Sequence, residues 1–257
     1  MAVPLEAVTF DFWNTLIQEG GGAGSTAFRE RRVDVWLGLF EGEGIALERA
    51  SIDAAYTDAW NVFQDHWTSN RPYGAAQAVD EVLARLGLEI PAGLRDELLA
   101  VVTDPAAEHY PFPTDGIGDC LERLSSAGLR IGIICDVGLA PSPTLRRYLA
   151  HHSLLDYFDH WSFSDEVGTF KPDPAIFHHA LSGLGAAAGG GPIDPGAAAH
   201  VGDLRRTDIG GARAVGMTAV RYSGVFDDPG SPEDGTDEVD GDLVIAHHAD
   251  LPAALGV

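Results

Sequence analysis

The chain has 257 residues, of which 45% are hydrophobic, and its formal net charge is −23, from 39 acidic and 16 basic residues. This length permits one large domain or two small ones with a real core, and the hydrophobic content excludes a disordered chain. Such an acidic surface repels nucleic acid and anionic membranes, so we expect neither as a partner. An anionic substrate would need local positive charge or a metal ion. The acidic segment from Asp227 to Asp242 is expected to serve solubility.

The sequence also restricts the compartment in which we expect the protein to act. No apolar run approaches the roughly 20 residues that span a bilayer, and the first residues lack a basic segment and a signal-like apolar block. The two cysteines, Cys120 and Cys135, are too few for a disulfide framework and lack the spacing of a metal site. We therefore expect a cytoplasmic protein that is a monomer or a homodimer.

The first predicted element is a buried strand, because the stretch over residues 8–17 opens as an apolar run rich in residues that favour strands; Asp11 and then Thr15 follow this run. Open α/β sheets bind their ligands beyond the C-terminal ends of the strands, where Asp11 would lie. The alternative is an aspartate that only caps a turn or a following helix. This stretch alone does not decide between the two.

Helical spacing of apolar residues dominates the next part of the chain, after a glycine-rich connection over 18–24. Four helices are predicted, the first capped by Ser25 or Thr26, the second beginning near Ser51, the third over Ala75–Leu86 and the fourth over Ala92–Val102. A proline-rich segment, 110–114, follows them. Residues 19–108 are therefore predicted to form an inserted all-α unit.

Strands and helices alternate in the remainder of the chain. Helices are predicted over 117–127, 142–151, 174–184 and 208–215, and strands over 129–135, 160–164, 198–202, 218–222 and 243–246. This alternation predicts parallel strand pairing through right-handed crossovers. Residues 1–18 and 109–257 are thus predicted to form an α/β core with a Rossmann-like, doubly wound parallel sheet.

Polar or glycine-containing loops follow four of the predicted strands. They begin at Asp11, at Cys135-Asp136, at Gly168 and at Gly202-Asp203. This order of motifs resembles the haloacid dehalogenase-like hydrolase superfamily, in which a helical cap is inserted after the first motif. The strongest matches are Ser164-Asp-Glu-Val-Gly-Thr-Phe-Lys-Pro-Asp-Pro174 and His200-Val-Gly-Asp203, and the resemblance covers nearly the whole chain.

The resemblance implies a catalytic site and a metal ion. In that superfamily the aspartate that matches Asp11 attacks a phosphoryl group or an electrophilic carbon, and the lysine that matches Lys171 orders it. Asp11 and Asp203, with the backbone carbonyl of Trp13, would hold Mg²⁺, and Asp208 would support that site. The cation would neutralise phosphate charge. The implied substrate is a small anionic, phosphorylated metabolite.

Three further positions, Thr15, Cys135 and Asp136, would lie on the substrate side of this site. Cys135 stands where the superfamily usually has serine or threonine, and a thiol is a weaker hydrogen-bond donor to phosphate. Asp136 stands where asparagine is common and adds a negative charge. Arg146 and Arg147 are candidate partners for that charge.

Trp13 is the departure with the largest functional consequence. Phosphatases of the superfamily usually carry a second aspartate here, which protonates the leaving oxygen and later activates water. Such acid–base help is worth roughly 10²–10⁴ in rate, and an indole cannot supply it. Three functions therefore stay open. They are a Mg²⁺-dependent phosphatase for substrates with good leaving groups, a carbon–halogen hydrolase of the 2-haloacid dehalogenase type, and a binding or regulatory protein with weak or no turnover.

Overall fold

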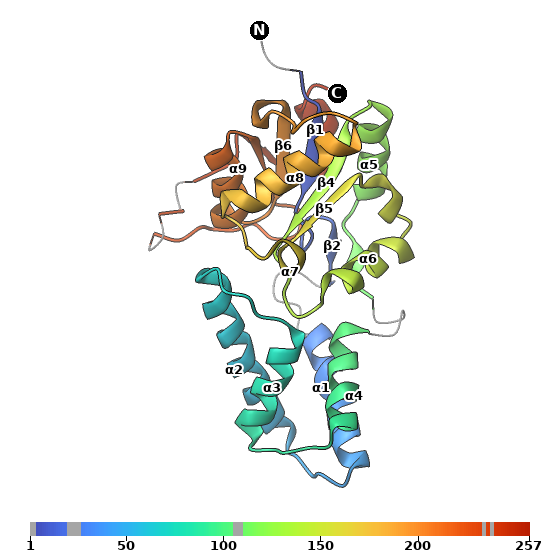
Figure 1. The fold of residues 1–257 in the computed structure, drawn as a ribbon, viewed down its shortest axis with the longest axis vertical. Helices are drawn as coiled ribbons and strands as arrows, with labels where there is room; N and C mark the ends of the chain where they lie inside the picture. Colours follow the sequence, from blue (N-terminus) through green and yellow to red (C-terminus); the bar gives the residue numbers. More distant parts are fainter. Residues whose placement is uncertain (1–3, 20–26, 105–109, 233–234, 237–238) are drawn as a thin grey trace. The chain divides into compact units, whose positions relative to one another are not determined.

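The computed structural model describes residues 4–19, 27–104, 110–232, 235–236 and 239–257. The chain divides into two compact units, of which the first comprises 1–23, 111–136 and 149–257 and the second comprises 24–110 and 137–148 (Figure 1). Most of the predicted glycine-rich connection and the predicted cap at Ser25 or Thr26 lie outside the described residues.

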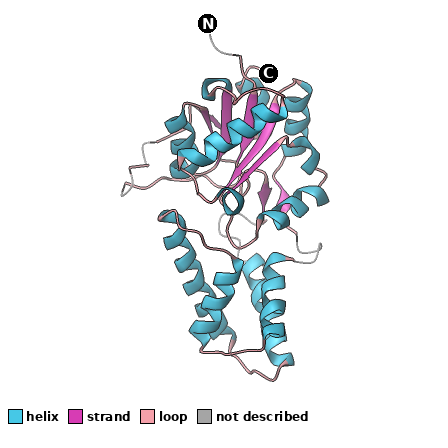
Figure 2. Cartoon of the chain, viewed as in Figure 1, coloured by secondary structure: helices cyan, strands magenta, loops and turns pink. Residues whose placement is uncertain are grey.

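The first unit is built on a six-stranded parallel sheet (Figure 2). Its strands are β1 (Ala7–Phe10), β4 (Arg130–Cys135), β5 (His160–Phe163), β6 (Ala198–Gly202), β7 (Thr218–Tyr222) and β8 (Leu243–Ile245). The strand order β5-β4-β1-β6-β7-β8 places β1 inside the sheet, where Ala7 pairs with Arg130 on one side and Ala198 on the other. The predicted α/β class with a Rossmann-like parallel sheet is confirmed.

Helices flank this sheet and supply its apolar core. They are α5 (Ile117–Ser126), α7 (Ser164–Val167), α8 (Pro174–Ala187), α9 (Gly210–Val215), α10 (Leu251–Ala254) and the end of α6 (Ser142–His151). Helix α8 begins where it does because the Asp173 side chain accepts a hydrogen bond from the Ala175 amide, at 2.9 Å, and Pro174 occupies the first turn. Its apolar stripe joins Ile134 of β4 and residues of β1, β6 and β7 in one buried cluster.

Several predicted boundaries in this unit were wrong, among them the end of α8, which was predicted at 184 and lies at Ala187. Two of the differences change the type of element. Ser164 does not end β5 but begins α7, and the helix predicted over 208–215 is a π-helical turn, Arg205–Ile209, followed by α9. The turn forms because the Asp208 carboxylate accepts a hydrogen bond from the Leu204 amide, at 2.9 Å, which draws the side chain back over its own loop.

Arginines hold several aspartates of the acidic segment 227–242. Arg221 is buried and forms ion pairs with Asp227 and Asp240, while Arg205 donates to both the carboxylate and the carbonyl of Asp228. Arg213 pairs with Asp242. These four aspartates are therefore bound to arginines of the sheet unit.

A short antiparallel ribbon lies outside the main sheet and was not predicted. It pairs β2 (Ile17–Gln18) with β3 (Phe112–Pro113), and the Thr114 amide extends it by donating to the Leu16 carbonyl at 3.0 Å. Pro113 fits there because a two-stranded ribbon leaves one side of each strand without backbone partners.

The second unit is helical and contains α1 (Ala27–Gly42), α2 (Arg49–Thr68), α3 (Ala75–Leu86) and α4 (Ala92–Thr103). The four helices share a buried cluster in which the Trp36 indole donates to the Leu98 carbonyl at 3.0 Å. Residues 137–148 also group with this unit, and Leu139 joins its cluster, which the sequence did not predict. In the described part of the chain, no helix has the length and apolar character needed to cross a membrane.

Candidate active site

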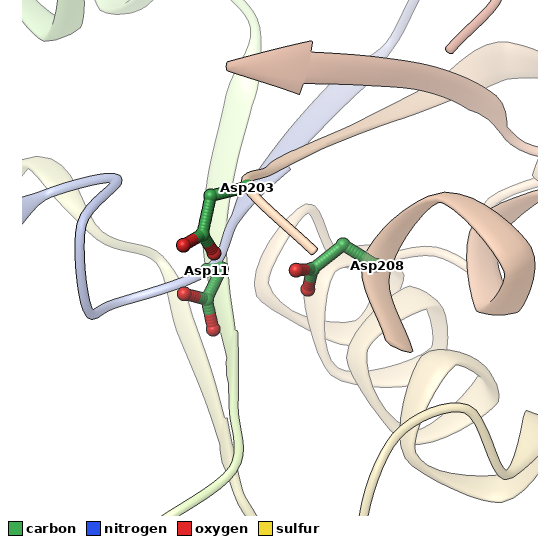
Figure 3. Close-up of side chains that lie close together, drawn as sticks. All are labelled: Asp11, Asp203 and Asp208. Atoms are coloured by element: carbon green, nitrogen blue, oxygen red, sulfur yellow. The ribbon is translucent and has the colours of Figure 1, made fainter. Parts of the chain in front are cut away.

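Three carboxylates converge beyond the C-terminal ends of neighbouring strands. Asp11 follows β1, Asp203 follows β6, and Asp208 comes from the π-helical turn after β6. All three residues are buried, and one oxygen from each lies within 4.8 Å of the others. Figure 3 shows the three carboxyl groups turned toward one another. The sheet thus brings together residues that are nearly 200 positions apart in the sequence.

Lys171 supplies the positive charge of this cluster. Its buried ammonium donates to Asp11 Oδ1 at 2.5 Å, to Asp208 Oδ1 at 2.6 Å and to the Ile134 carbonyl at 3.1 Å. These three acceptors use the three hydrogens of the ammonium, so its orientation is defined. The predicted association of Lys171 with Asp11 is present in the structure.

The main chain of Lys171 is held as well. The Lys171 amide donates to Asp136 Oδ1 at 2.8 Å, and the Lys171–Pro172 peptide bond is cis. Asp136 therefore accepts a hydrogen bond from the loop that carries the lysine, a contact the sequence did not predict. Arg147, a candidate partner for Asp136, instead lies 3.0 Å from Asp104 inside the helical unit. The predicted substrate contact of Asp136 stays a prediction.

His200 connects this cluster to the interior of the sheet and was not predicted. Its Nε2 lies 3.2 Å from Asp208 Oδ1, and its Nδ1 lies 2.9 Å from Thr9 Oγ1 on β1. Burial lowers the pKa of the fully buried His200 imidazole despite the opposing effect of Asp208. In the sequence, only the alternation of side chains along the strand indicates on which face of β6 His200 lies. That indication becomes useful once the pairing of β1 with β6 is known.

Gly202 allows Asp208 to reach the cluster. A Cβ atom at this position would lie 2.3 Å from Asp208 Cγ, which is far inside van der Waals contact. Any side chain at residue 202 would therefore displace the carboxylate of Asp208 from Lys171 and from His200.

Asn14 is a second functional candidate that the sequence did not reveal. Its backbone lies in the left-handed region, with φ of 57°, which asparagine tolerates better than most residues. Its side-chain amide donates to Asp203 Oδ2 at 3.1 Å. Asn14 thereby orients the one carboxylate of the cluster for which no hydrogen bond to Lys171 is observed.

The cluster is short of positive charge. Burial raises the pKa of Asp11 to about 7 although Lys171 opposes the shift, and burial with the charges of Asp11 and Asp208 raises the pKa of Asp203. Burial alone would lower the pKa of Lys171, but Asp11 and Asp208 raise it well above its ordinary value. Burial would also raise the pKa of Asp208, but Lys171 and His200 hold it below its ordinary value. One lysine therefore does not balance three carboxylates.

The remaining predicted residues lie near these strand ends with defined packing. The half-buried Trp13 indole contacts Phe12 edge-on, with ring centroids 5.2 Å apart. Cys135 is fully buried, which raises the pKa of its thiol and disfavours redox chemistry. The Thr15 carbonyl accepts hydrogen bonds from His248 Nε2 at 2.8 Å and from Thr114 Oγ1 at 2.7 Å. The predicted substrate contacts of Thr15 and Cys135, and the metal contact of Trp13, stay predictions.

Comparison with known proteins gives relatives of two kinds. The chain is 29% identical over 187 residues to human haloacid dehalogenase-like hydrolase domain-containing protein 3, covering 68% of each chain. It is 32% identical over 171 residues to the glyceraldehyde 3-phosphate phosphatase of Pyrococcus furiosus, covering 66% of this chain and 64% of that protein.

Solved structures and a family model agree with this fold. A 2-haloacid dehalogenase from Pseudomonas syringae has a TM-score of 0.66 at 23% identity and covers 98% of both chains, which shows the fold alone. The family model for haloacid dehalogenase-like hydrolase matches residues 5–216, which include all four motif loops. The chain therefore belongs to the haloacid dehalogenase-like hydrolases and is a hydrolase of that family.

Proposed function

We propose that this protein is a Mg²⁺-dependent phosphatase that hydrolyses a small phosphorylated metabolite with Asp11 as the nucleophile. The observation that carries the proposal is the double hydrogen bond of the Lys171 ammonium to Asp11 and Asp208 beside the third carboxylate, Asp203. The similarity to a protein named as a glyceraldehyde 3-phosphate phosphatase supports a phosphorylated substrate.

The donor set fits a magnesium ion. Carboxylate oxygens are the ligands that Mg²⁺ prefers, and the raised pKa values of Asp11 and Asp203 show where positive charge is missing. Asp11, Asp203 and the backbone carbonyl of Trp13 would hold the ion, and Asp208 would support them. A bound Mg²⁺ would neutralise charge on the phosphoryl oxygens.

Asp11 and Lys171 have different roles in the proposed reaction. Lys171 holds Asp11 Oδ1, so Oδ2 is the oxygen that attacks phosphorus while the bond from phosphorus to the substrate oxygen breaks. Water then hydrolyses the aspartyl phosphate, which releases inorganic phosphate and restores the Asp11 carboxylate. Lys171 stays protonated throughout, because its carboxylate neighbours raise its pKa, and it offsets the negative charge of the phosphoryl group.

Trp13 restricts the substrates for which this chemistry is fast. The indole has no proton to give to a departing alkoxide, so a leaving group that is stable as an anion is favoured. An acyl phosphate has such a leaving group, since it departs as a carboxylate. We therefore propose a preference for acyl phosphates over phosphate monoesters of ordinary alcohols.

We further propose that the helical unit acts as a cap that selects the substrate, with residues 1–18 and 109–257 as the catalytic core. Its support is the place of the insert in the chain, directly after the loop that carries Asp11. The proposed substrate is a small anion, for which Lys171 supplies charge.

A metabolite phosphatase panel tests this function. Wild-type protein and the variant Asp11→Asn are assayed for phosphate release from acyl phosphates and phosphate monoesters, with Mg²⁺ and with chelator. We expect release from wild-type protein only with Mg²⁺, and none from Asp11→Asn. Asp80→Asn, in the helical unit, is the matched control and should retain wild-type activity. Phosphate release that survives in Asp11→Asn, or that ignores chelator, would refute the proposal.

Carbon–halogen hydrolysis is the second candidate, and Trp13 is the observation that favours it. Asp11 would attack carbon and halide would leave without needing a proton, so the absence of an acid at position 13 would not slow the reaction. The three clustered carboxylates favour the phosphatase, since displacement of halide from carbon by a carboxylate needs no metal ion. Chloride release from a 2-haloacid in the presence of chelator would reverse this order.

A further inference from the structure

Two histidines outside the cluster of Asp11, Asp203 and Asp208 lie close together, His160 on β5 and His179 on α8. His160 Nε2 lies 3.4 Å from His179 Nδ1, and the two ring centroids are 5.0 Å apart. Ser162, on the same strand as His160, places its Oγ 2.8 Å from the same His179 Nδ1. Two imidazole nitrogens and a hydroxyl oxygen thus converge on one position.

The separation of the two nitrogens matches metal coordination. Nitrogens that are each bound about 2.0–2.1 Å from a tetrahedral metal ion lie about 3.3–3.4 Å from one another. A direct hydrogen bond between nitrogens is usually shorter, about 2.9–3.0 Å. The observed 3.4 Å therefore suits two ligands of one ion without movement of either ring.

The backbone of α8 gives His160 this position. A Cβ atom at Gly183 would lie 2.1 Å from His160 Cε1 and 2.2 Å from its Nδ1, so the ring occupies the space that any side chain at residue 183 would fill. His179 lies one helical turn before Gly183 and therefore on the same face of α8. The pair is thus set by packing and does not depend on a chance approach of two surface side chains.

Both rings are accessible, and the His160 imidazole is in the form that binds metal. His179 is exposed and His160 is half-buried. Burial, with a further effect of His179, lowers the pKa of His160, so its imidazole is neutral at pH 7. A neutral imidazole offers the lone pair that a metal ion needs.

We propose that His160 and His179 form a binding site for a late first-row transition-metal ion such as Zn²⁺ or Ni²⁺. Imidazole suits these ions, whereas the all-oxygen cluster at the strand ends suits Mg²⁺. Water completes the coordination, and the Ser162 hydroxyl, which lies 2.8 Å from His179 Nδ1, gives up that hydrogen bond to the ion. The two sites are chemically distinct.

Metal binding at this pair would close a loop that carries a residue of the active site. His160 lies on β5 and His179 on α8, and the chain between them contains α7 and Lys171. A metal ion that joins the two histidines restricts this segment in the same way as a covalent cross-link. The site would therefore steady the Lys171 loop without taking part in the chemistry, and this consequence rests on the proposed role of Lys171.

Metal titration of three proteins tests the site. Wild-type protein, His179→Ala and the matched control His178→Ala, which removes the adjacent exposed histidine, are titrated with Ni²⁺ and with Zn²⁺ by calorimetry and by thermal unfolding. We expect saturating metal to raise the Tm of wild type and of His178→Ala by about 5 °C. We expect affinity to fall at least about tenfold in His179→Ala, because one imidazole binds without the second. The strand-end carboxylates are present in all three proteins, so their metal binding cancels in the comparison.

A second variant tests whether metal binding needs the observed arrangement of the two histidines or only their presence in the chain. Gly183→Ala keeps both ligands and favours the helix, but its methyl group displaces the His160 ring. We expect it to lose Ni²⁺ binding as His179→Ala does. Hydrogen exchange of residues 164–173 should slow on Zn²⁺ addition in wild type and not in Gly183→Ala. Equal metal affinity in wild type and His179→Ala would overturn the proposal, whatever the outcome of the phosphatase panel.

Discussion

The two units of this protein use charge in opposite ways. In the sheet unit, Lys171 is 3% exposed and holds Asp11 and Asp208, which are also buried. In the helical unit, the pair between Arg95 and Asp80 has good geometry, with contacts of 2.7 and 2.8 Å, but lies in solvent. Water screens the second pair much more strongly than the first. The Lys171 cluster therefore places charge in the interior of the sheet unit, whereas the pair of Arg95 and Asp80 places it on the surface of the helical unit.

The largest loss of stability and activity should follow removal of the buried Lys171 ammonium. Lys171→Met leaves two buried carboxylates without their partner, which costs about 3–5 kcal/mol of the free energy of unfolding. We also expect hydrolysis to fall by about 10²–10³-fold, as for loss of one preorganised donor. Urea unfolding and turnover assays measure both effects. Circular dichroism should show a retained fold, and wild-type turnover in this variant would refute the assigned role of the lysine.

The buried histidine beneath Thr15 should make the sheet unit sensitive to acid. Burial lowers the pKa of His248 to about 4, and the hydrogen bond that its Nε2 donates to the Thr15 carbonyl only partly opposes this shift. The His248 ring stacks on Tyr222, with ring centroids 4.1 Å apart. The folded pKa lies below the unfolded value of about 6.5, so this stability is complete above pH 6.5 and is lost as pH falls toward 4. We expect a loss on the order of 2–3 kcal/mol at pH 4.5.

Urea unfolding at pH 7 and pH 4.5 measures the effect of His248. His248→Gln retains a donor for the Thr15 carbonyl but cannot titrate, so its stability should fall less on acidification than that of wild type. His66→Gln, in the helical unit, is the control and should follow wild type. An identical acid response of wild type and His248→Gln would show that His248 does not contribute.

A smaller effect should follow loss of the Asn14 side chain. Asn14→Gly keeps the left-handed backbone without strain but removes the amide that donates to Asp203. Because partners of metal ligands are commonly worth 10–100-fold in affinity, we expect Mg²⁺ binding to weaken by about tenfold. Calorimetric titration with Mg²⁺ measures this change. Asn70→Gly is the matched control, since Asn70 has a φ of 50° in the helical unit, and it should bind Mg²⁺ as wild type does.

The smallest effect is expected for the exposed pair itself. Arg95→Met makes the same kind of change as Lys171→Met, loss of a cation beside a carboxylate, but in solvent. We expect it to cost less than about 1 kcal/mol of the free energy of unfolding and to leave hydrolysis unchanged. Urea unfolding of both variants under one buffer measures the contrast. Comparable losses in the two would show that burial is not what separates the units.

The sequence predicted those parts of the molecule that depend on local patterns. Helices over 75–86 and 142–151 and strands over 198–202 and 218–222 have the predicted bounds, since apolar period and flanking glycines are local signals. The convergence of Asp11, Asp203 and Asp208 was predicted from the resemblance to the haloacid dehalogenase-like hydrolases, and the parallel sheet explains it, because its strand ends meet at one edge.

Contacts that depend on the register between paired strands could not be predicted from the sequence. The hydrogen bond of His200 to Thr9 exists because Thr9 pairs with His200 in the β1–β6 register, which no local pattern specifies. Arg147, one of the two arginines proposed as partners of Asp136, lies beside Asp104 instead, and Asp136 accepts a hydrogen bond from the Lys171 amide, which was not predicted. A backbone donor is as good a partner as an arginine, and proximity in sequence does not choose between them.

The position of β1 in the sheet has a consequence for the order in which the molecule is made. This strand is synthesised first, but both of its partners, β4 and β6, begin at Arg130 and Ala198. This apolar strand therefore stays without its partner strands while the helical insert is synthesised and forms its own local contacts. Pairing across such separations is slow to form, and an unpaired apolar strand is open to wrong partners. We expect the nascent chain to depend on chaperones most strongly between completion of the insert and the arrival of β6.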